Sequence, residues 1–379
     1  METVKADIYK DSVLGLIPRD WDVKLLPEVF DYIHGKAHEQ YINKNGKFIV
    51  VNSKFISTEG SVIKKSEENF CPAKTGDILT VLSDLPNGKA LAKTFYVDKD
   101  NKYAVNQRIC IWRSKKDDSR FLSYIMNRNK YFLKYDDGVT QTHILNHHIE
   151  KCPVLVPRNK LEQKAIAQVL SDTDALIQAL EKKIAKKKLI KKGVMQRLLT
   201  PKEGWVIKTL GEFLKYEQPT NYIVESTEYD DNYDIPVLTA GKSFVLGYTN
   251  EKQNVFENHP VIIFDDFTTA SKYVDFPFKV KSSAMKILKL REGNVNLRFI
   301  YELMQQINFP LGDHKRHWIG EFQSIEVKVP DSEEEQNRIA QILSDMDREI
   351  ANLEQKLSKY QLAKQGMMQQ LLTGKIRLA

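Results

Sequence analysis

Short runs of polar, basic and aromatic side chains that can bind nucleic acid recur along the chain, mostly in segments predicted to be loops. In the first half the candidate DNA-binding residues are Lys36, His38, Tyr41, Ser83, Asn87, Lys89, Asn106, Gln107, Arg108, Gln141, Thr142 and His143. In the second half they are Thr239, Lys242, Ser243, Thr268, Thr269, Lys272, Tyr273, Ser282, Ser283, His314, Lys315, Arg316 and His317. Arginine and lysine can bond guanine edges or phosphates, asparagine and glutamine can pair with adenine, and serine and threonine can do either. Each run alone is a weak signal, because surface loops are polar for many reasons.

Patterns for catalysis or metal binding are incomplete. Gly241–Ser243 resembles the end of a phosphate-binding loop, but Pro236 stands where that loop needs its first glycine. No two prolines are adjacent, which excludes the Asn/Asp-Pro-Pro-aromatic motif with which amino-methyltransferases hold a flipped base. His314 and His317 are spaced to share a helix face, but no third ligand is suitably placed. We therefore expect no catalytic residues, no metal site and a chain that is not itself an enzyme.

Length and composition agree with a binding protein. The chain has 379 residues, enough for two or three domains of about 150 residues each. Its formal net charge of +7 permits a nucleic-acid partner without requiring one. The longest apolar runs, such as Phe48–Val51, have four residues, whereas a membrane span needs about 20, so we expect no membrane association. Three distant cysteines and the absence of a signal-peptide pattern favour a cytoplasmic location.

One segment of the chain occurs twice. Residues 156–200 and 329–373 are identical at 24 of 45 aligned positions, with a constant offset of 173. A weaker similarity precedes each copy at Trp21 and Trp205, each a few residues after a proline. The sequence therefore indicates a duplicated unit, in which a variable module is followed by a shared segment.

Both shared segments have the pattern of a coiled-coil helix, because apolar residues alternate in steps of four and three. The predicted helix-helix seam consists of Ile166, Leu170, Ile177, Leu180, Ile184, Ile339, Leu343, Met346, Ile350, Leu353 and Leu357. We expect the helices to start at Pro157 and Pro330, and some 38 residues would give a rod of roughly 57 Å.

The charges of the two helices predict how they pair. Residues 157–200 carry eleven basic and four acidic side chains, whereas residues 330–373 carry five and eight. The basic run lies late in the first helix and the acidic run early in the second, so antiparallel packing within one chain would bring them together. The alternative is that the lysines merely solvate a free helix face.

The two modules read as small mixed α/β domains. In the first we predict strands at 47–51, 77–82 and 107–112 and a helix at 119–127. In the second we predict strands at 235–238, 261–264 and 285–290 and a helix at 297–307. The fold class is thus mixed α/β, with two globular domains joined by two long antiparallel helices in a duplicated, pseudo-twofold architecture. The predicted domains are 1–156, first helix 157–200, 201–328, and second helix with C-terminal tail 329–379.

This pattern resembles the specificity subunit of type I restriction-modification systems over essentially the full chain. The marks of the resemblance are the helix cores at Glu162–Asp172 and Glu335–Asp345, the Leu-Leu-Thr endings at Leu198–Thr200 and Leu371–Thr373, Trp21 and Trp205, and the stretches 76–79, 84–89, 106–108, 264–268 and 317–320. The resemblance implies that each module is a target-recognition domain that reads one half of a bipartite, asymmetric DNA site. It implies that the helices set the separation of the half-sites and dock two methyltransferase subunits, which endonuclease-translocase subunits join. The partners would hold S-adenosylmethionine, ATP and Mg, with none of them bound by this chain.

Two alternatives remain open at this point. The chain could serve as the specificity module of a fused, type II-like restriction-methylation enzyme. It could instead be a coiled-coil scaffold or regulator whose modules read no DNA.

Overall fold

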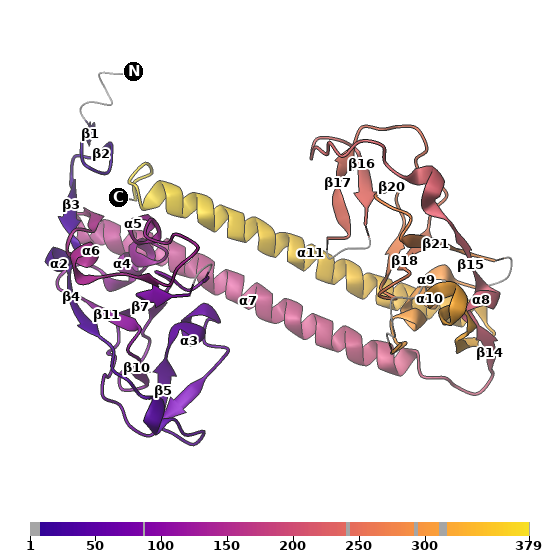
Figure 1. Ribbon diagram of the computed structural model, residues 1–379, viewed down its shortest axis with the longest axis horizontal. Coiled ribbons are helices and arrows are strands. Elements are labelled where there is room, and N and C mark those ends of the chain that lie inside the picture. Colours follow the sequence, from indigo (N-terminus) through magenta and orange to yellow (C-terminus); the bar gives the residue numbers. More distant parts are fainter. Residues whose placement is uncertain (1–7, 86–87, 240–242, 292–294, 311–316, 379) are drawn as a thin grey trace. The chain divides into compact units, whose positions relative to one another are not determined.

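The chain forms two compact units, each built from one α/β module and parts of two long helices (Figure 1). The computed structural model describes residues 8–85, 88–239, 243–291, 295–310 and 317–378. Unit 1 comprises residues 1–180 and 356–379, and unit 2 comprises residues 181–355. Module 1, from Trp21 to Pro157, lies in unit 1, and module 2, from Trp205 to Pro330, lies in unit 2.

Module 1 is organised around two sheets. A four-stranded antiparallel sheet has the order β4 (Phe30–His34), β11 (Ile109–Ser114), β7 (Ile78–Val81) and β9 (Thr94–Tyr96). A three-stranded sheet has the order β10 (Tyr103–Val105), β5 (Phe48–Val51) and β6 (Lys64–Ser66), with β10 and β5 parallel. The remaining elements of unit 1 before the long helix are β1 (Tyr9–Lys10), β2 (Ile17–Pro18), β3 (Trp21–Leu25), α2 (Leu26–Val29), η1 (Glu39–Tyr41), α3 (Ser53–Ser57), β8 (Ser83–Asp84), α4 (Ser119–Met126), α5 (Lys130–Leu133), β12 (Thr142–His143), α6 (Asn146–Glu150) and β13 (Pro153–Pro157).

Module 2 repeats this plan with unlike residues. Its four-stranded sheet has the order β15 (Leu214–Glu217), β21 (Met285–Leu290), β18 (Val261–Asp265) and β19 (Ser271–Val274). Its three-stranded sheet has the order β17 (Val245–Thr249), β16 (Ile235–Leu238) and β20 (Lys279–Val280), with β16 and β20 parallel. The other elements are β14 (Trp205–Thr209), α8 (Leu210–Phe213), η2 (Pro219–Tyr222), α9 (Leu297–Met304), α10 (His317–Gly320), η3 (Phe322–Ser324) and β22 (Glu326–Pro330).

Both four-stranded sheets have a core on each face, as the two-residue period of a strand requires. In β11, Cys110 and Trp112 enter the core that includes the start of the long helix, whereas Ile109 and Ile111 face the three-stranded sheet. In β18, Ile262 and Phe264 take the first role, and Val261 and Ile263 take the second. The strands and helices predicted from the sequence are confirmed, with end shifts of up to three residues.

Each module closes where its helix begins. Strand β3 pairs with β13 so that Trp21 lies opposite Pro157, and β14 pairs with β22 so that Trp205 lies opposite Pro330. The long helices α7 (Lys160–Leu198) and α11 (Glu333–Leu371) therefore start three residues after these prolines. Our placement of the helix starts at Pro157 and Pro330 was wrong, because both prolines still belong to paired strands.

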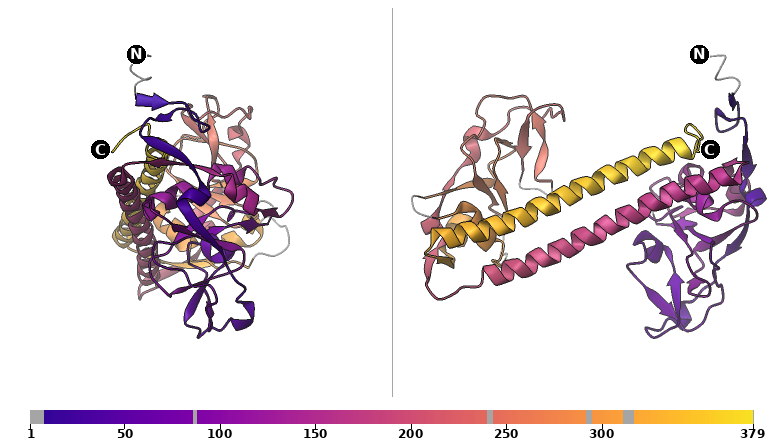
Figure 2. Two further views of the ribbon diagram at one scale, coloured as in Figure 1. Left: turned by 90° about the vertical axis from the view of Figure 1, so that its left-hand side faces the viewer. Right: turned by 180° about the vertical axis from the view of Figure 1, so that it is seen from behind.

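Segments of α7 and α11 pair antiparallel within each unit, as the charge pattern predicted (Figure 2). In unit 1, Asp174 binds Lys364 with an N–O distance of 2.5 Å. In unit 2, three ion pairs join the basic run of α7 to the acidic part of α11, namely Lys187–Glu349, Lys188–Glu354 and Lys191–Asp347. The lysines therefore contact the partner helix and do not merely solvate a free face.

The predicted seam residues fall into two groups. Ile166 and Leu170 are fully buried in the core of module 1, and Ile339 and Leu343 are equally buried in that of module 2. Of the others, Leu180, Ile184 and Ile350 are buried, and Ile177, Met346, Leu353 and Leu357 are half-buried. The first turns of each helix thus anchor a module, and the seam proper lies further along. Among the described residues, none of the helices is long and apolar enough to span a membrane.

Candidate nucleic-acid interface

The polar loops of module 1 gather at one end of its four-stranded sheet. Because β11 is antiparallel to both β4 and β7, the ends of β4 and β7 meet the start of β11. Backbone hydrogen bonds hold the loops together there: Leu82 N–H donates to Arg108 O over 3.1 Å, and Lys36 N–H donates to Val105 O over 3.0 Å. Strand β12 then joins by pairing with β8. We call this surface loop edge 1, comprising residues 35–41, 82–85, 88–90, 106–108 and 141–143.

Loop edge 1 exposes about half of the residues predicted for it. The exposed side chains are Lys36, Tyr41, Lys89, Gln107, Arg108 and His143, with Gln141 half-buried. His38, Ser83, Asn106 and Thr142 are buried. Asn87 lies outside the described residues. The exposed set is basic and amide-bearing, as recognition of phosphates and base edges requires.

Two of the buried side chains support the loops and do not face solvent. His38 Nδ1 donates to Lys36 O over 2.6 Å, and its Nε2 accepts from Phe70 N–H over 3.1 Å. Burial lowers the pKa of His38 from its ordinary value, which favours this neutral form. Asn106 Nδ2 donates to Glu39 Oε1 over 2.9 Å, and this bond lowers the pKa of Glu39. We therefore assign His38 and Asn106 to positioning of the loops, in place of the DNA contact that the sequence suggested.

Module 2 gathers its polar loops at the same end of the equivalent sheet. The end of β18 and the start of β21 meet where Asp266 N–H bonds Ala284 O over 3.4 Å. Lys281 N–H donates to Leu238 O over 2.8 Å, which brings the residues after β16 alongside. We call this surface loop edge 2, comprising residues 218–222, 239, 243, 265–272 and 281–284.

Most predicted residues of module 2 lie on loop edge 2. Ser243, Thr268, Lys272 and Ser283 are exposed, and Thr239, Thr269 and Ser282 are half-buried. Tyr273 instead packs under the guanidinium of Arg298, 4.9 Å from the ring centroid, on the side of α9. His317 is buried against Phe309. Lys242, His314, Lys315 and Arg316 lie outside the described residues.

The paired acids after β18 order the loop. Asp265 accepts hydrogen bonds from Phe267 N–H over 2.9 Å and from Thr268 Oγ1 over 2.6 Å. Asp266 accepts from Trp318 N–H over 2.9 Å and forms a buried ion pair with Lys286 at 3.6 Å. Both carboxylates are therefore occupied within the module, and the charge of Asp266 is partly neutralised by Lys286.

Sequence reasoning missed part of loop edge 2. Gln218, Thr220 and Asn221 follow β15 and are exposed, just as Lys36 follows β4 in module 1. Lys281, next to the predicted serines, lies 5.9 Å from the centroid of the Tyr229 ring. The signal that identifies these residues is the repeated topology, which the unlike sequences of the modules conceal.

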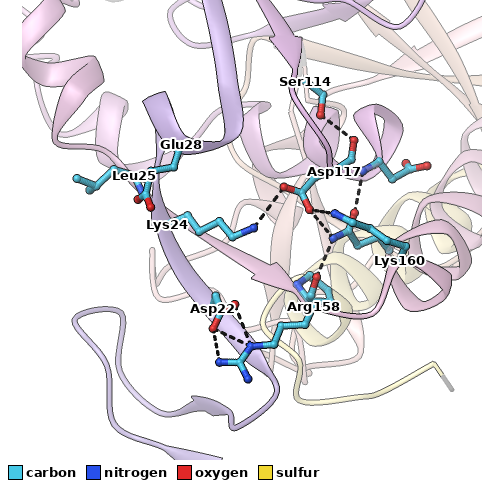
Figure 3. Close-up of polar contacts among 11 residues, drawn as sticks. Asp22, Lys24, Leu25, Glu28, Ser114, Asp117, Arg158 and Lys160 are labelled. Carbon is cyan, nitrogen blue, oxygen red and sulfur yellow. Dashed lines mark hydrogen bonds and ion pairs between the residues drawn. The ribbon is translucent and has the colours of Figure 1, made fainter.

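A buried polar joint fixes module 1 to the start of α7 (Figure 3). Asp117 accepts from Gln163 Nε2 over 2.8 Å and binds Lys160 and Lys24, the latter at 3.5 Å. Nearby, Arg158 forms a two-pronged bond with Asp22, whose pKa it lowers by hydrogen bonding. The joint therefore ties the first turn of α7 to strand β3 and to the loop before α4.

The same glutamine of the repeated segment makes equivalent bonds in each unit. Gln163 accepts from Asp118 N–H over 2.7 Å and donates to Pro157 O over 2.7 Å. Gln336 accepts from Asn296 N–H over 2.9 Å and donates to Pro330 O over 2.8 Å. Asp118 and Asn296 are the N-caps of α4 and α9. Each glutamine thus connects the long helix, the last strand and the main helix of its module.

Comparison with known proteins shows the family. Residues 18–189 and 202–360 match the type I restriction modification DNA specificity domain. The type I restriction enzyme EcoR124I/EcoR124II specificity subunit of Escherichia coli is 51% identical over 126 residues, which are 32% of this chain and 31% of that protein. The type I restriction enzyme MjaVIII specificity subunit of Methanocaldococcus jannaschii is 29% identical over 209 residues, 51% of this chain and 49% of that protein. Each of these alignments thus spans half or less of the relative's own length.

A solved structure shares the fold over nearly the whole chain. The S subunit of a type I restriction-modification system from M. genitalium superposes with a TM-score of 0.69, covering 93% of this chain and 96% of that chain at 17% identity. The two segments that match the specificity domain together make up most of the sequence. The chain therefore belongs to the specificity (S) subunit family of type I restriction-modification systems.

Proposed function

We propose that the chain recognises a bipartite DNA target, with loop edge 1 on one half and loop edge 2 on the other. The observation that supports this most is that unlike polar residues collect at the same end of the same sheet in both modules. A shared scaffold with different loop residues is what two readers of different half-sites need. Exposed basic and amide groups such as Arg108 and Gln107 suit base edges and phosphates.

The long helices supply two equivalent surfaces for partner subunits. In unit 1, Val169 of α7 is 37% exposed and Leu362 of α11 is 65% exposed. Their repeat equivalents in unit 2, Ile342 and Leu189, are 38% and 70% exposed. We name the pair Val169 and Leu362 docking face 1, and the pair Ile342 and Leu189 docking face 2. Retention of exposed apolar residues at matching positions supports the docking of two copies of one partner, a methyltransferase subunit.

The chemistry of restriction and modification then belongs to the partners. Methyl transfer with S-adenosylmethionine would take place in the methyltransferase subunits, and ATP- and Mg-dependent cleavage in the endonuclease-translocase subunits. The role of this chain is to place those subunits on double-stranded DNA. Its modest positive charge fits this division, because the partners can provide further phosphate contacts.

The test is a methylation map of a host that expresses the chain with its methyltransferase subunits. Replacing Gln107 and Arg108 together by alanine should relax one or two base positions in one half-site, by about 5- to 150-fold in discrimination. Replacing Lys272 and Ser283 together by alanine should relax positions in the other half-site only. Lys74→Ala, at the opposite end of β7, is the matched control and should leave the motif unchanged.

Two results would contradict the proposal. One is that the two double variants alter the same half-site. The other is that neither alters the motif although both complexes still bind DNA.

A further inference from the structure

The duplicated helices place the same acid-base pair beside each module. In unit 1, Asp174 of α7 binds Lys364 of α11 at 2.5 Å. In unit 2, Asp347 of α11 binds Lys191 of α7 at 2.6 Å. The offset of 173 relates Asp174 to Asp347 and Lys191 to Lys364, so these are two copies of one feature. We call each pair a socket.

Module 1 inserts a tyrosine into its socket. Tyr124, on α4, donates its hydroxyl proton to Asp174 Oδ2 over 2.8 Å. Lys364 Nζ lies 5.7 Å from the centroid of the Tyr124 ring. One turn earlier, the guanidinium of Arg120 stacks on Tyr96 of β9 at 4.5 Å and on Tyr124 at 5.6 Å. Burial raises the pKa of Tyr124, which keeps the hydroxyl protonated as a donor.

Module 2 fills its socket from the same helix positions with different chemistry. Arg298, on α9, binds Asp347, and Glu302, one turn later, lies 3.7 Å from Lys191. Arg298 and Glu302 also pair with each other at 2.6 Å. Arg298 stacks on Tyr273 of β19 at 4.9 Å, as Arg120 stacks on Tyr96. Arg120 and Arg298 are each the second residue of their helix, and Tyr124 and Glu302 are each the sixth.

The buried charges of the sockets are better suited to fixing the orientation of a module than to raising the stability of the fold. The side chain of Glu302 is fully buried and those of Arg298 and Lys191 are 17% exposed. Buried ion pairs add little net stability because desolvation offsets their attraction, but they penalise arrangements that leave a charge unpaired. A module that rocked on its helices would break these bonds, whereas an apolar contact could slide.

We propose that the two sockets are positioning sites that fix the orientation of each module on the helices, and that the key residues are Tyr124 in module 1 and Arg298 with Glu302 in module 2. This inference rests on the proposed function, since the orientation of the modules then sets the gap between half-sites that the subunit accepts. The long helices contribute the same aspartate and lysine in both units, whereas the modules contribute different residues. A module therefore fits a socket if its own helix, α4 or α9, presents a hydrogen-bond donor or a charge pair that can bind this aspartate and lysine.

The test measures gap tolerance with the assembled methyltransferase complex. Binding is compared on duplexes that carry both half-sites with the native gap or with a gap one base pair longer or shorter. Asp347→Asn should lower the affinity ratio between native and altered gaps at least tenfold, with base preference inside each half-site retained. Asp345→Asn is the matched control on the same helix, since Asp345 bonds only neighbours on α11 in the contacts described for it, and it should keep the wild-type ratio.

A second variant keeps the inference falsifiable if Asp347→Asn assembles poorly. Glu302→Tyr, with Arg298 retained, places in module 2 the tyrosine that module 1 has at the same helix position. This variant should keep the affinity ratio between native and altered gaps within threefold of the wild-type ratio. Glu302→Leu, which removes the group facing Lys191, should lower it. A wild-type ratio in Asp347→Asn or in Glu302→Leu, or loss of base preference along with gap preference, would overturn the socket inference. Absence of sequence-specific binding by the wild-type complex would instead overturn the proposed function and this inference with it.

Discussion

At the residue scale, the repeated glutamines show how one side chain can organise a domain boundary. Gln163 and Gln336 are fully buried. The side chain of each accepts a hydrogen bond from the backbone N–H of a helix N-cap and donates one to the carbonyl of the last strand. Replacement by an apolar residue would leave both backbone groups without these bonds, at about 1–3 kcal/mol for each buried group. The sequence showed that this glutamine recurs but not why, since its donors lie 45 and 40 residues earlier in the chain.

His38 gives loop edge 1 a pH dependence whose sign can be stated. Burial holds the pKa of folded His38 below its ordinary value of 6.5, so the unfolded chain binds the proton more tightly. The stabilisation by neutral His38 is complete above about pH 6.5 and is lost as the pH falls through that value towards the lower folded pKa. We expect thermal unfolding of the wild type to shift to lower temperature between pH 7 and 5 more steeply than that of His38→Gln.

The exposed histidine on the same edge provides the control for this prediction. His143→Gln is the matched control for the loss of an imidazole on loop edge 1, since the side chain of His143 is exposed and that of His38 is buried. If the unfolding temperature falls equally steeply between pH 7 and 5 in the wild type and in His38→Gln, His38 is not the group that causes this pH dependence. A pH titration of the His38 ring followed by nuclear magnetic resonance should have its midpoint below the ordinary value of 6.5.

At the element scale, local patterns were informative and long-range pairings were not. The strands β7, β11, β18 and β21 are short apolar runs bounded by turn residues, so they could be predicted from the sequence alone. The ribbons that close each module, β3 with β13 and β14 with β22, join residues more than a hundred positions apart. Their cue was only the repeated tryptophan and proline, which indicated a boundary but not a pairing. That pairing explains why the helix starts were placed three residues too early.

The segment after α11 closes unit 1 through a buried carboxylate. Arg377 binds Glu162 over 2.5 and 2.8 Å and Asp20 over 2.9 and 2.5 Å. Glu162 also accepts from Trp21 Nε1 over 3.1 Å. The equivalent contact in unit 2 is Lys202 with Glu335 at 2.7 Å. The side chain of Glu162 is 2% exposed and that of Glu335 is 24% exposed, so the two contacts should differ in energy.

Arginine removal tests this difference. In the part of the chain that the structure describes, Arg377→Ala leaves the buried Glu162 carboxylate with one side-chain donor, the indole of Trp21. We expect the free energy of unfolding of unit 1 to fall by about 2 kcal/mol. This value is below the cost of breaking a fully buried pair, because Arg377 is partly exposed. Lys202→Ala should cost unit 2 about 0.5 kcal/mol or less. Denaturant unfolding of the full chain, followed by amide exchange in each unit, measures both values. Equal losses would show that burial of the glutamate does not govern the contact.

At the scale of the whole molecule, the duplication is visible in the sequence mainly in the two long helices. The two helical segments are identical at 24 of 45 positions, whereas the two modules share their sheet topology but present unlike residues in their loops. A sequence pattern can therefore identify the helices and the family, because repeated residues carry those features, and it can identify the antiparallel pairing from the charges in which the two helices differ. It cannot identify which loop residues converge, since Gln218 and Lys36 occupy equivalent places without any likeness in type. The exposed residues of loop edge 1 and loop edge 2 thus differ in type although they occupy equivalent places in the topology.

The two docking faces predict that the chain binds two methyltransferase subunits and that each can be removed by a separate substitution. If each face binds one methyltransferase subunit, Leu189→Lys removes face 2 and Leu362→Lys removes face 1, because a buried lysine at an apolar contact is costly. Native mass spectrometry should then find two partner subunits on the wild type, one on either single variant and none on the double variant. Val139→Lys, on an exposed loop of module 1, is the control and should retain two, since Val139 is 78% exposed but has no repeat equivalent on a helix. Retention of two partners by the double variant would place the contact elsewhere on the chain, and loss of both partners in a single variant would mean that the faces are not independent.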